Sequence, residues 1–137
     1  MKFLEFKGFG DAENAAFESL KRGDVGNYHP ETEEGINFFI FEFDENQPFL
    51  NKNLEYSIGQ LLWNDNQPIM RMKGLIFCSN QEKKCYLQGV EDVFEVEPSN
   101  VFWRDSEKKY SKFLFIGKGL DKDLIKRRLE ECLTLNN

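Results

Sequence analysis

Two segments of this sequence predict β-strands whose side chains are apolar on both faces. In Ile36–Phe43, alternation places Phe39 and Phe41 on one face and Phe38 and Ile40 on the other. Residues 113–116 share this property. A strand of this kind has to be covered on both sides, so the chain is not expected to form a sheet with one face in water.

Two segments predict helices long enough to cover a sheet. Leu50, Leu54, Ile58, Leu61 and Leu62 recur at helical spacing, which predicts a helix that starts with Asn51 or a neighbour as its cap and ends near Trp63. Asp121 is a strong N-cap for a closing helix, with Leu120 and Ile125 as a hydrophobic staple. Two helices cover one face of a sheet. Either residues 1–30 fold over the other face, or these strands are simply central in the sheet, or that face is a docking surface for another domain or a client protein, and these alternatives stand.

The remaining segments complete an α+β order of elements. Residues 69–78 and 84–90 predict a hairpin, residues 93–96 and 101–103 short extended pieces around Pro98, and residues 110–117 the last strand. We therefore predict a two-layer fold of order β-α-β-β-β-β-α, in which an antiparallel or mixed sheet of four to five strands carries two helices on one face. Residues 36–137 form this domain, and residues 1–35, rich in glycine, are interpreted as an N-terminal arm or linker.

Composition excludes several classes of function. A formal net charge of −6 and an acidic pI near 4.9 argue against nucleic-acid binding, which needs a basic surface. No apolar run approaches the ~18 residues of a membrane-spanning helix, and charges interrupt the apolar residues at the N-terminus, as they would not in a signal peptide. The three cysteines are odd in number and do not form a disulfide framework. These features predict a cytoplasmic protein.

Several motifs occur in the order and spacing of one known family. Residues 69–75, Ile-Met-Arg-Met-Lys-Gly-Leu, resemble the Arg-x-Lys-Gly strand of the C-terminal domain of the CobW family of P-loop GTPases. The resemblance covers roughly residues 29–134 and includes Leu61-Leu-Trp63, Leu87-Gln-Gly-Val90, Trp103-Arg-Asp105, Phe115-Ile-Gly117 and Leu120-Asp121. It implies a domain attached to a GTPase, in proteins similar to cobalamin-synthesis CobW and to metal chaperones that serve zinc homeostasis.

The GTPase half of that family is missing from this sequence. No Gly-x-x-x-x-Gly-Lys-[Ser/Thr] motif is present to bind nucleotide phosphates, and the Cys-x-Cys-Cys motif of the family's GTPase domain is absent. The resemblance thus implies a non-catalytic protein-interaction domain without a cofactor. By the same resemblance, such a domain is expected to pack against a GTPase domain in cis or in trans and to help recognise a client metalloprotein or a metal cargo. The alternative is a free-standing module that self-associates.

Four residues are candidates for docking a partner. Arg71 and Lys73 share one strand face and are able to hold an anion or an acidic surface, and cross-strand pairing with Asp or Glu is the alternative explanation. The resemblance adds Gln88 and Trp103.

Catalytic and metal sites are not expected. The single His29 has no nucleophile and orienting group around it in the sequence, so no catalytic residue is assigned. Cys78 and Cys85 flank the predicted hairpin and, with His29 or Cys132, are the candidates for a metal site. Their spacing is looser than that of a structural zinc site, and ordinary buried thiols are the simpler interpretation.

Overall fold

A computed structural model describes residues 35–135 of the chain. Residues 1–34 lie outside the described residues. They include His29 and all of the predicted N-terminal arm except Gly35. Within them, five strands form one antiparallel sheet in the order β1-β5-β2-β3-β4. The strands are β1 (Ile36–Phe43), β2 (Ile69–Ile76), β3 (Lys83–Val90), β4 (Val93–Phe102) and β5 (Ser111–Lys118). The central β5 and β2 are the segments with the most continuously buried side chains.

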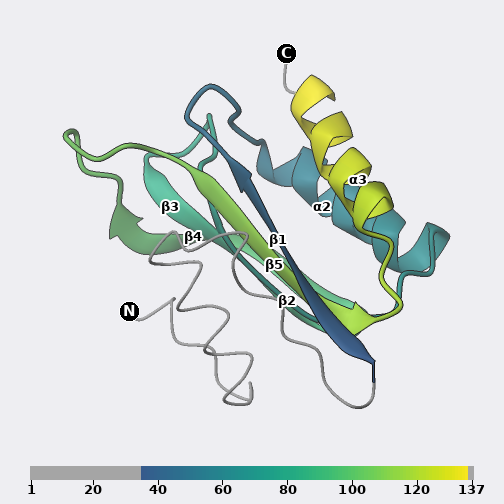
Figure 1. The fold of residues 1–137 in the computed structure, drawn as a ribbon. Coiled ribbons are helices and arrows are strands. Elements are labelled where there is room, and N and C mark those ends of the chain that lie inside the picture. Colours follow the sequence, from purple (N-terminus) through teal and green to yellow (C-terminus); the bar gives the residue numbers. More distant parts are fainter. Residues whose placement is uncertain (1–34, 136–137) are drawn as a thin grey trace.

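The helices form the second layer. Helix α2 (Asn51–Gly59) continues into a π-helical turn, η1 (Gln60–Asn64), and α3 (Lys122–Leu135) closes the domain. Both long helices lie on the same face of the sheet (Figure 1). The predicted α+β class, the β-α-β-β-β-β-α order and the placement of two helices on one face are confirmed.

The core between the layers is built largely from aromatic rings. Phe49, from the loop before α2, and Phe113 of β5 are both fully buried, and their ring centroids lie 5.4 Å apart at nearly right angles. Phe43 meets both rings edge-on. The helices contribute Leu54, Ile58, Leu61, Ile125 and Leu129 to the same cluster. Edge-to-face aromatic pairs of this kind add to the burial of apolar area, so the face of β1 and β5 that carries Phe43 and Phe113 anchors the helices.

The structure corrects the prediction around Pro98. The two short pieces expected there are one strand, β4, which runs through Pro98. Pro98 lies opposite Cys85, next to an irregularity in the β3–β4 register. Among the described strands β4 is at the edge of the sheet, where a missing backbone N–H need not interrupt a ladder.

The caps of the two helices differ in origin. Asp121 accepts a hydrogen bond from the backbone N–H of Leu124 through its Oδ1 (3.1 Å), which confirms it as the cap of α3. Helix α2 has Leu50 at its N-cap position and therefore no side-chain cap, because the leucine side chain has no hydrogen-bond acceptor. Asn51, the predicted cap, is the first helical residue, and its side chain accepts a hydrogen bond from the thiol of Cys78 (2.8 Å). The start of α2 is thus tied to the strand layer rather than capped.

Candidate docking surface

Three of the four predicted docking residues lie together on the sheet. Lys73 pairs with Gln88, and Arg71 pairs with Val90, in the β2–β3 register. Met72, between the two cations, belongs to the core under the helices, so Arg71 and Lys73 lie on the opposite face. Gln88 is exposed and Arg71 is half-buried, whereas Lys73 is fully buried. Only Arg71 and Gln88 are therefore accessible in this conformation.

The fourth residue, Trp103, belongs to a small aromatic cluster after β4. Its ring meets Phe77 and Tyr110 edge-on, with centroids 6.0 and 5.7 Å away. The Lys84 ammonium lies 5.0 Å from the ring centroid and pairs with Glu107 at 2.9 Å. Trp103 is buried, and within the described part of the chain its Nε1–H has no hydrogen-bond partner. This environment identifies Trp103 as a packing residue in the described conformation.

An exposed apolar surface lies at one end of the sheet, and we call it the end patch: Trp63, Met70, Val90 and Val93. The exposed fractions of these side chains are 63%, 37%, 44% and 73%. Val90 pairs with Val93 in the β3–β4 hairpin, and the N–H of Glu91 bonds to the carbonyl of Met70 (2.9 Å). The ring of Trp63 lies on the helix side of the same hairpin, where its centroid is 5.8 Å from that of Phe94. Large exposed side chains gathered at one place mark interaction surfaces more often than single ones do. Arg71 borders this patch through its pairing with Val90.

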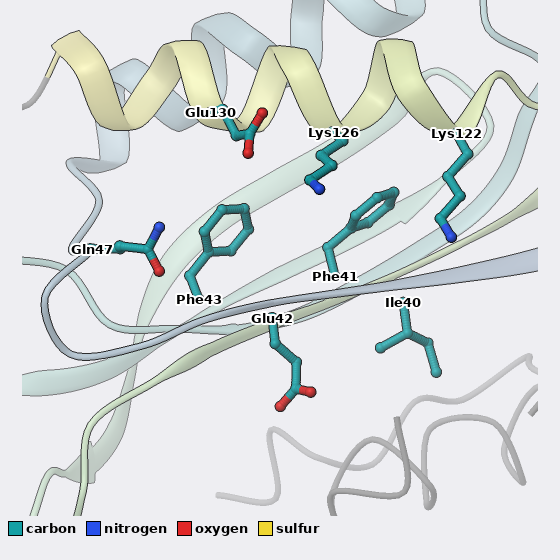
Figure 2. A pocket seen from close by; sticks show the side chains of 8 residues that line it. All are labelled: Ile40, Phe41, Glu42, Phe43, Gln47, Lys122, Lys126 and Glu130. Carbon is teal, nitrogen blue, oxygen red and sulfur yellow. The ribbon is translucent and has the colours of Figure 1, made fainter. Parts of the chain in front are cut away.

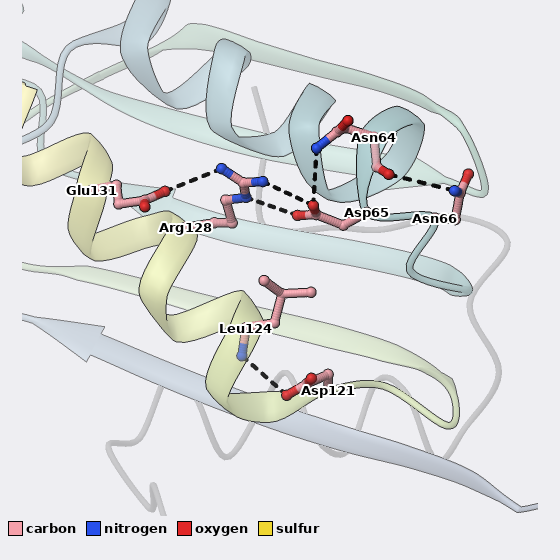
Figure 3. Close-up of polar contacts among 7 residues, drawn as sticks. All are labelled: Asn64, Asp65, Asn66, Asp121, Leu124, Arg128 and Glu131. Carbon is pink, nitrogen blue, oxygen red and sulfur yellow. Dashed lines mark hydrogen bonds and ion pairs between the residues drawn. The ribbon is translucent and has the colours of Figure 1, made fainter.

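A bidentate ion pair fixes the segment that follows Trp63 (Figure 3). Arg128 of α3 donates from Nε and Nη2 to the two carboxylate oxygens of Asp65, both at 2.8 Å, and from Nη1 to Glu131 at 3.2 Å. The hydrogen bonds from Arg128 hold the pKa of Asp65 below its ordinary value. The amide of Asn64 also donates to Asp65 (3.2 Å). The pair therefore joins α3 to the end of η1, beside the end patch.

The two candidate metal-binding thiols lie together in the core. Cys78 and Cys85 are both fully buried. The neighbouring Cys85 thiol and burial both raise the pKa of Cys78. Cys132 is buried separately, near Ser57, and burial raises its pKa to about 12. Among residues 35–135, no group of three or more His, Cys, Asp or Glu side chains is placed to hold a metal ion.

Sequence reasoning missed the end patch and the Asp65–Arg128 pair. Both join segments that are distant along the chain, so no local pattern marks them. The one available signal was the placement of Val90 and Val93 on either side of a polar two-residue turn, because apolar residues beside a solvent-exposed turn are unusual.

The described helices include none that is long and apolar enough to cross a membrane.

Comparison with known proteins assigns the fold and the family. Two solved structures match with a TM-score of 0.63 each: the Zn(II)-bound YjiA GTPase from E. coli, at 19% identity, and a Zn(II)-bound triple mutant of the YjiA GTPase, at 21% identity. The matches cover 78% and 72% of this chain, but only 37% and 30% of the respective GTPase chains. At this identity they establish a shared fold, which here is that of one part of a larger GTPase.

The family itself is shown by a direct match. Residues 38–133 match the model of the cobalamin synthesis protein cobW C-terminal domain. The chain therefore belongs to the CobW C-terminal domain family, as its motifs indicated. The matched range begins within β1 and ends within α3, so it includes all or most of every strand and helix of the two-layer fold.

Proposed function

We propose that this chain is the non-catalytic C-terminal domain of a CobW-type GTPase system, which packs against the GTPase domain and helps to recognise a client protein or a metal cargo. The observation that carries the proposal is the family match over residues 38–133, together with a chain that spans about a third of the GTPases whose fold it shares. The P-loop motif that binds nucleotide in such proteins has to come from elsewhere, in cis or in trans.

The end patch is the surface we assign to the GTPase domain. It offers apolar side chains that are more than a third exposed, with the guanidinium of Arg71 and the amide of Gln88 beside them. Apolar centres bordered by polar groups are typical of protein interfaces. The Asp65–Arg128 pair holds the turn after Trp63 in a fixed position, which lowers the entropy lost on association.

A single charge in the patch tests this assignment. Tagged wild-type chain and a Val93→Asp variant are expressed in the source organism, and proteins captured under native conditions are searched by mass spectrometry for a peptide with the P-loop motif. The expected result is that wild type captures a P-loop GTPase and Val93→Asp loses at least about tenfold of it, because a buried carboxylate without a partner opposes association. If the GTPase is its own covalent extension, the readout becomes domain separation by limited proteolysis.

Val101→Asp is the matched control. Val101 is also a valine of β4 and is 36% exposed, but it lies at the other end of the strand from Val93. Capture of the GTPase by Val101→Asp should equal that of wild type. Equal loss in both variants would remove the end patch from the proposal, and a wild-type chain that captures only copies of itself would favour the self-associating module instead.

A further inference from the structure

A groove lies between the edge of the sheet and the closing helix (Figure 2). Its volume is about 280 Å³, and four consecutive residues of β1, 40–43, line one side of it. Side chains of consecutive strand residues point to opposite faces, so a groove that contacts all four runs along the edge of the strand. The other side is formed by Lys122, Lys126 and Glu130 of α3.

Among the strands that the structure describes, the one that borders the groove, β1, is at the end of the sheet. Among the described strands, β1 is hydrogen-bonded to β5 alone. In an antiparallel pair, alternate residues of an edge strand direct their N–H and C=O groups away from the partner. Within residues 40–43 these outward groups face the groove, and they match the hydrogen-bonding pattern of an added strand.

The groove has an apolar floor and one positively charged end. Phe41 and Phe43 point from β1 towards α3, while Glu42 points to the opposite face of the sheet, where it pairs with Lys112 (Figure 2). Lys122 and Lys126 are both exposed, reach towards β1 and are four residues apart, hence on one side of the helix. Gln47 and Glu130 lie at the other end, near Phe43.

We propose that this groove binds an extended acidic segment of a partner protein, which adds to β1 as an antiparallel strand. Because β1 runs from the lysine end towards Phe43, an antiparallel segment brings its C-terminal half to Lys122 and Lys126. Its carboxylates pair with the two ammonium groups there, close to the positive N-terminal end of α3. The first half of the segment lies near Gln47, where polar side chains fit.

Charge favours a different protein over a second copy of this chain. The lysine end of the groove attracts carboxylates, whereas the groove-facing side chains of β1, the strand that a second copy would offer, are Phe41 and Phe43. The proposal requires only the chain itself. It is independent of the GTPase role, and each can fail without the other.

The test uses full-length chain and a fluorescein-labelled peptide, acetyl-TVTVEVE-amide, followed by fluorescence anisotropy. We expect saturable binding that weakens with added salt, and loss of at least about tenfold in affinity for the reversed-charge peptide acetyl-TVTVKVK-amide. In amide NMR spectra, the largest shifts should fall on residues 40–43 and on the face of α3 with Lys122 and Lys126. Absence of saturable binding up to about 1 mM peptide would overturn the proposal.

Matched variants separate groove electrostatics from overall charge. Lys122→Glu/Lys126→Glu should weaken binding of TVTVEVE at least about tenfold, while Arg104→Glu/Lys108→Glu, the same charge change on an exposed loop, should change it less than about twofold. Equal loss of peptide binding in both double variants would overturn the site. A wild-type chain that sediments as a dimer, together with a Lys122→Glu/Lys126→Glu variant that sediments as a monomer, would overturn it as well.

Methylated peptides supply a test that needs no protein variant. N-methylation of alternate peptide amides removes the donors on one edge of the added strand, so one alternating set should abolish binding and the other should preserve it. Equal effects of both sets would contradict strand addition.

Discussion

The Asp65–Arg128 pair provides a stability prediction that follows directly from its geometry. Two hydrogen bonds of 2.8 Å join the carboxylate to the guanidinium, and the exposed fractions of the two side chains are 10% and 21%. Exposed single-contact pairs contribute about 0.2–1 kcal/mol, and bidentate charged hydrogen bonds shielded from water contribute more. We therefore expect a coupling free energy of about 1–2 kcal/mol.

A double-mutant cycle measures that coupling. Asp65→Ala, Arg128→Ala and the double variant are unfolded in urea at pH 7, and the free energies of unfolding give the interaction term. The Lys84–Glu107 pair is the control, because it has one contact of 2.9 Å and exposed fractions of 18% and 25%. Its coupling should stay below about 1 kcal/mol. A coupling for Asp65 and Arg128 no larger than that of the control would refute the reasoning.

The same pair predicts a pH dependence with a defined sign. Arg128 lowers the pKa of Asp65 in the folded state, so its contribution is fully present above the unfolded-state pKa of about 3.9 and is lost as pH falls through the folded pKa. The difference in stability between wild type and Asp65→Asn should therefore shrink below about pH 4. A difference that stays constant down to pH 2 would show that the carboxylate charge is not the source.

Two further perturbations test the packing of the core. Gly117→Ala should destabilise the fold by about 2–4 kcal/mol in urea unfolding, because the added methyl would overlap the backbone carbonyl of Pro68. Gly59→Ala is its control and should be far milder, since the methyl meets only the exposed ring of Trp63. Cys132, whose pKa burial raises to about 12, should resist iodoacetamide at pH 8 and react only after unfolding. Rapid labelling of the native chain would contradict its burial.

The sequence predicted the individual strands and the cap of the closing helix, because these depend on residues close together along the chain. The two-faced alternation of Ile36–Phe43 and the cap at Asp121 both appear in the structure, because strand period and helix capping are decided within a few residues. The prediction of two short pieces around Pro98 was wrong, because a strand accommodates a proline when it lies at the edge of the sheet. That position of β4 depends on the topology, which the local sequence does not show. The π-helical turn after Gly59 likewise has no local signal that we recognise.

The candidate surface was less predictable than the fold. Arg71 and Lys73 were placed correctly on one strand face, but their accessibility differs because burial depends on what packs around each position. Val90 and Val93 become a surface only together with Trp63 and Met70, which come from other parts of the chain. A surface assembled from distant segments is a property of the tertiary structure, so alternation and spacing do not reveal it.

The central claim is that this chain works as the C-terminal domain of a CobW-type GTPase system, and native immunoprecipitation from the source tests it most directly. An antibody to the chain is used, and the precipitate is analysed by size and by mass spectrometry for a P-loop peptide. The account predicts either a band well above 16.2 kDa that itself contains the P-loop motif, or a band at 16.2 kDa with a P-loop GTPase bound to it. A chain of 16.2 kDa without any P-loop GTPase, whether alone or with copies of itself, would contradict the account.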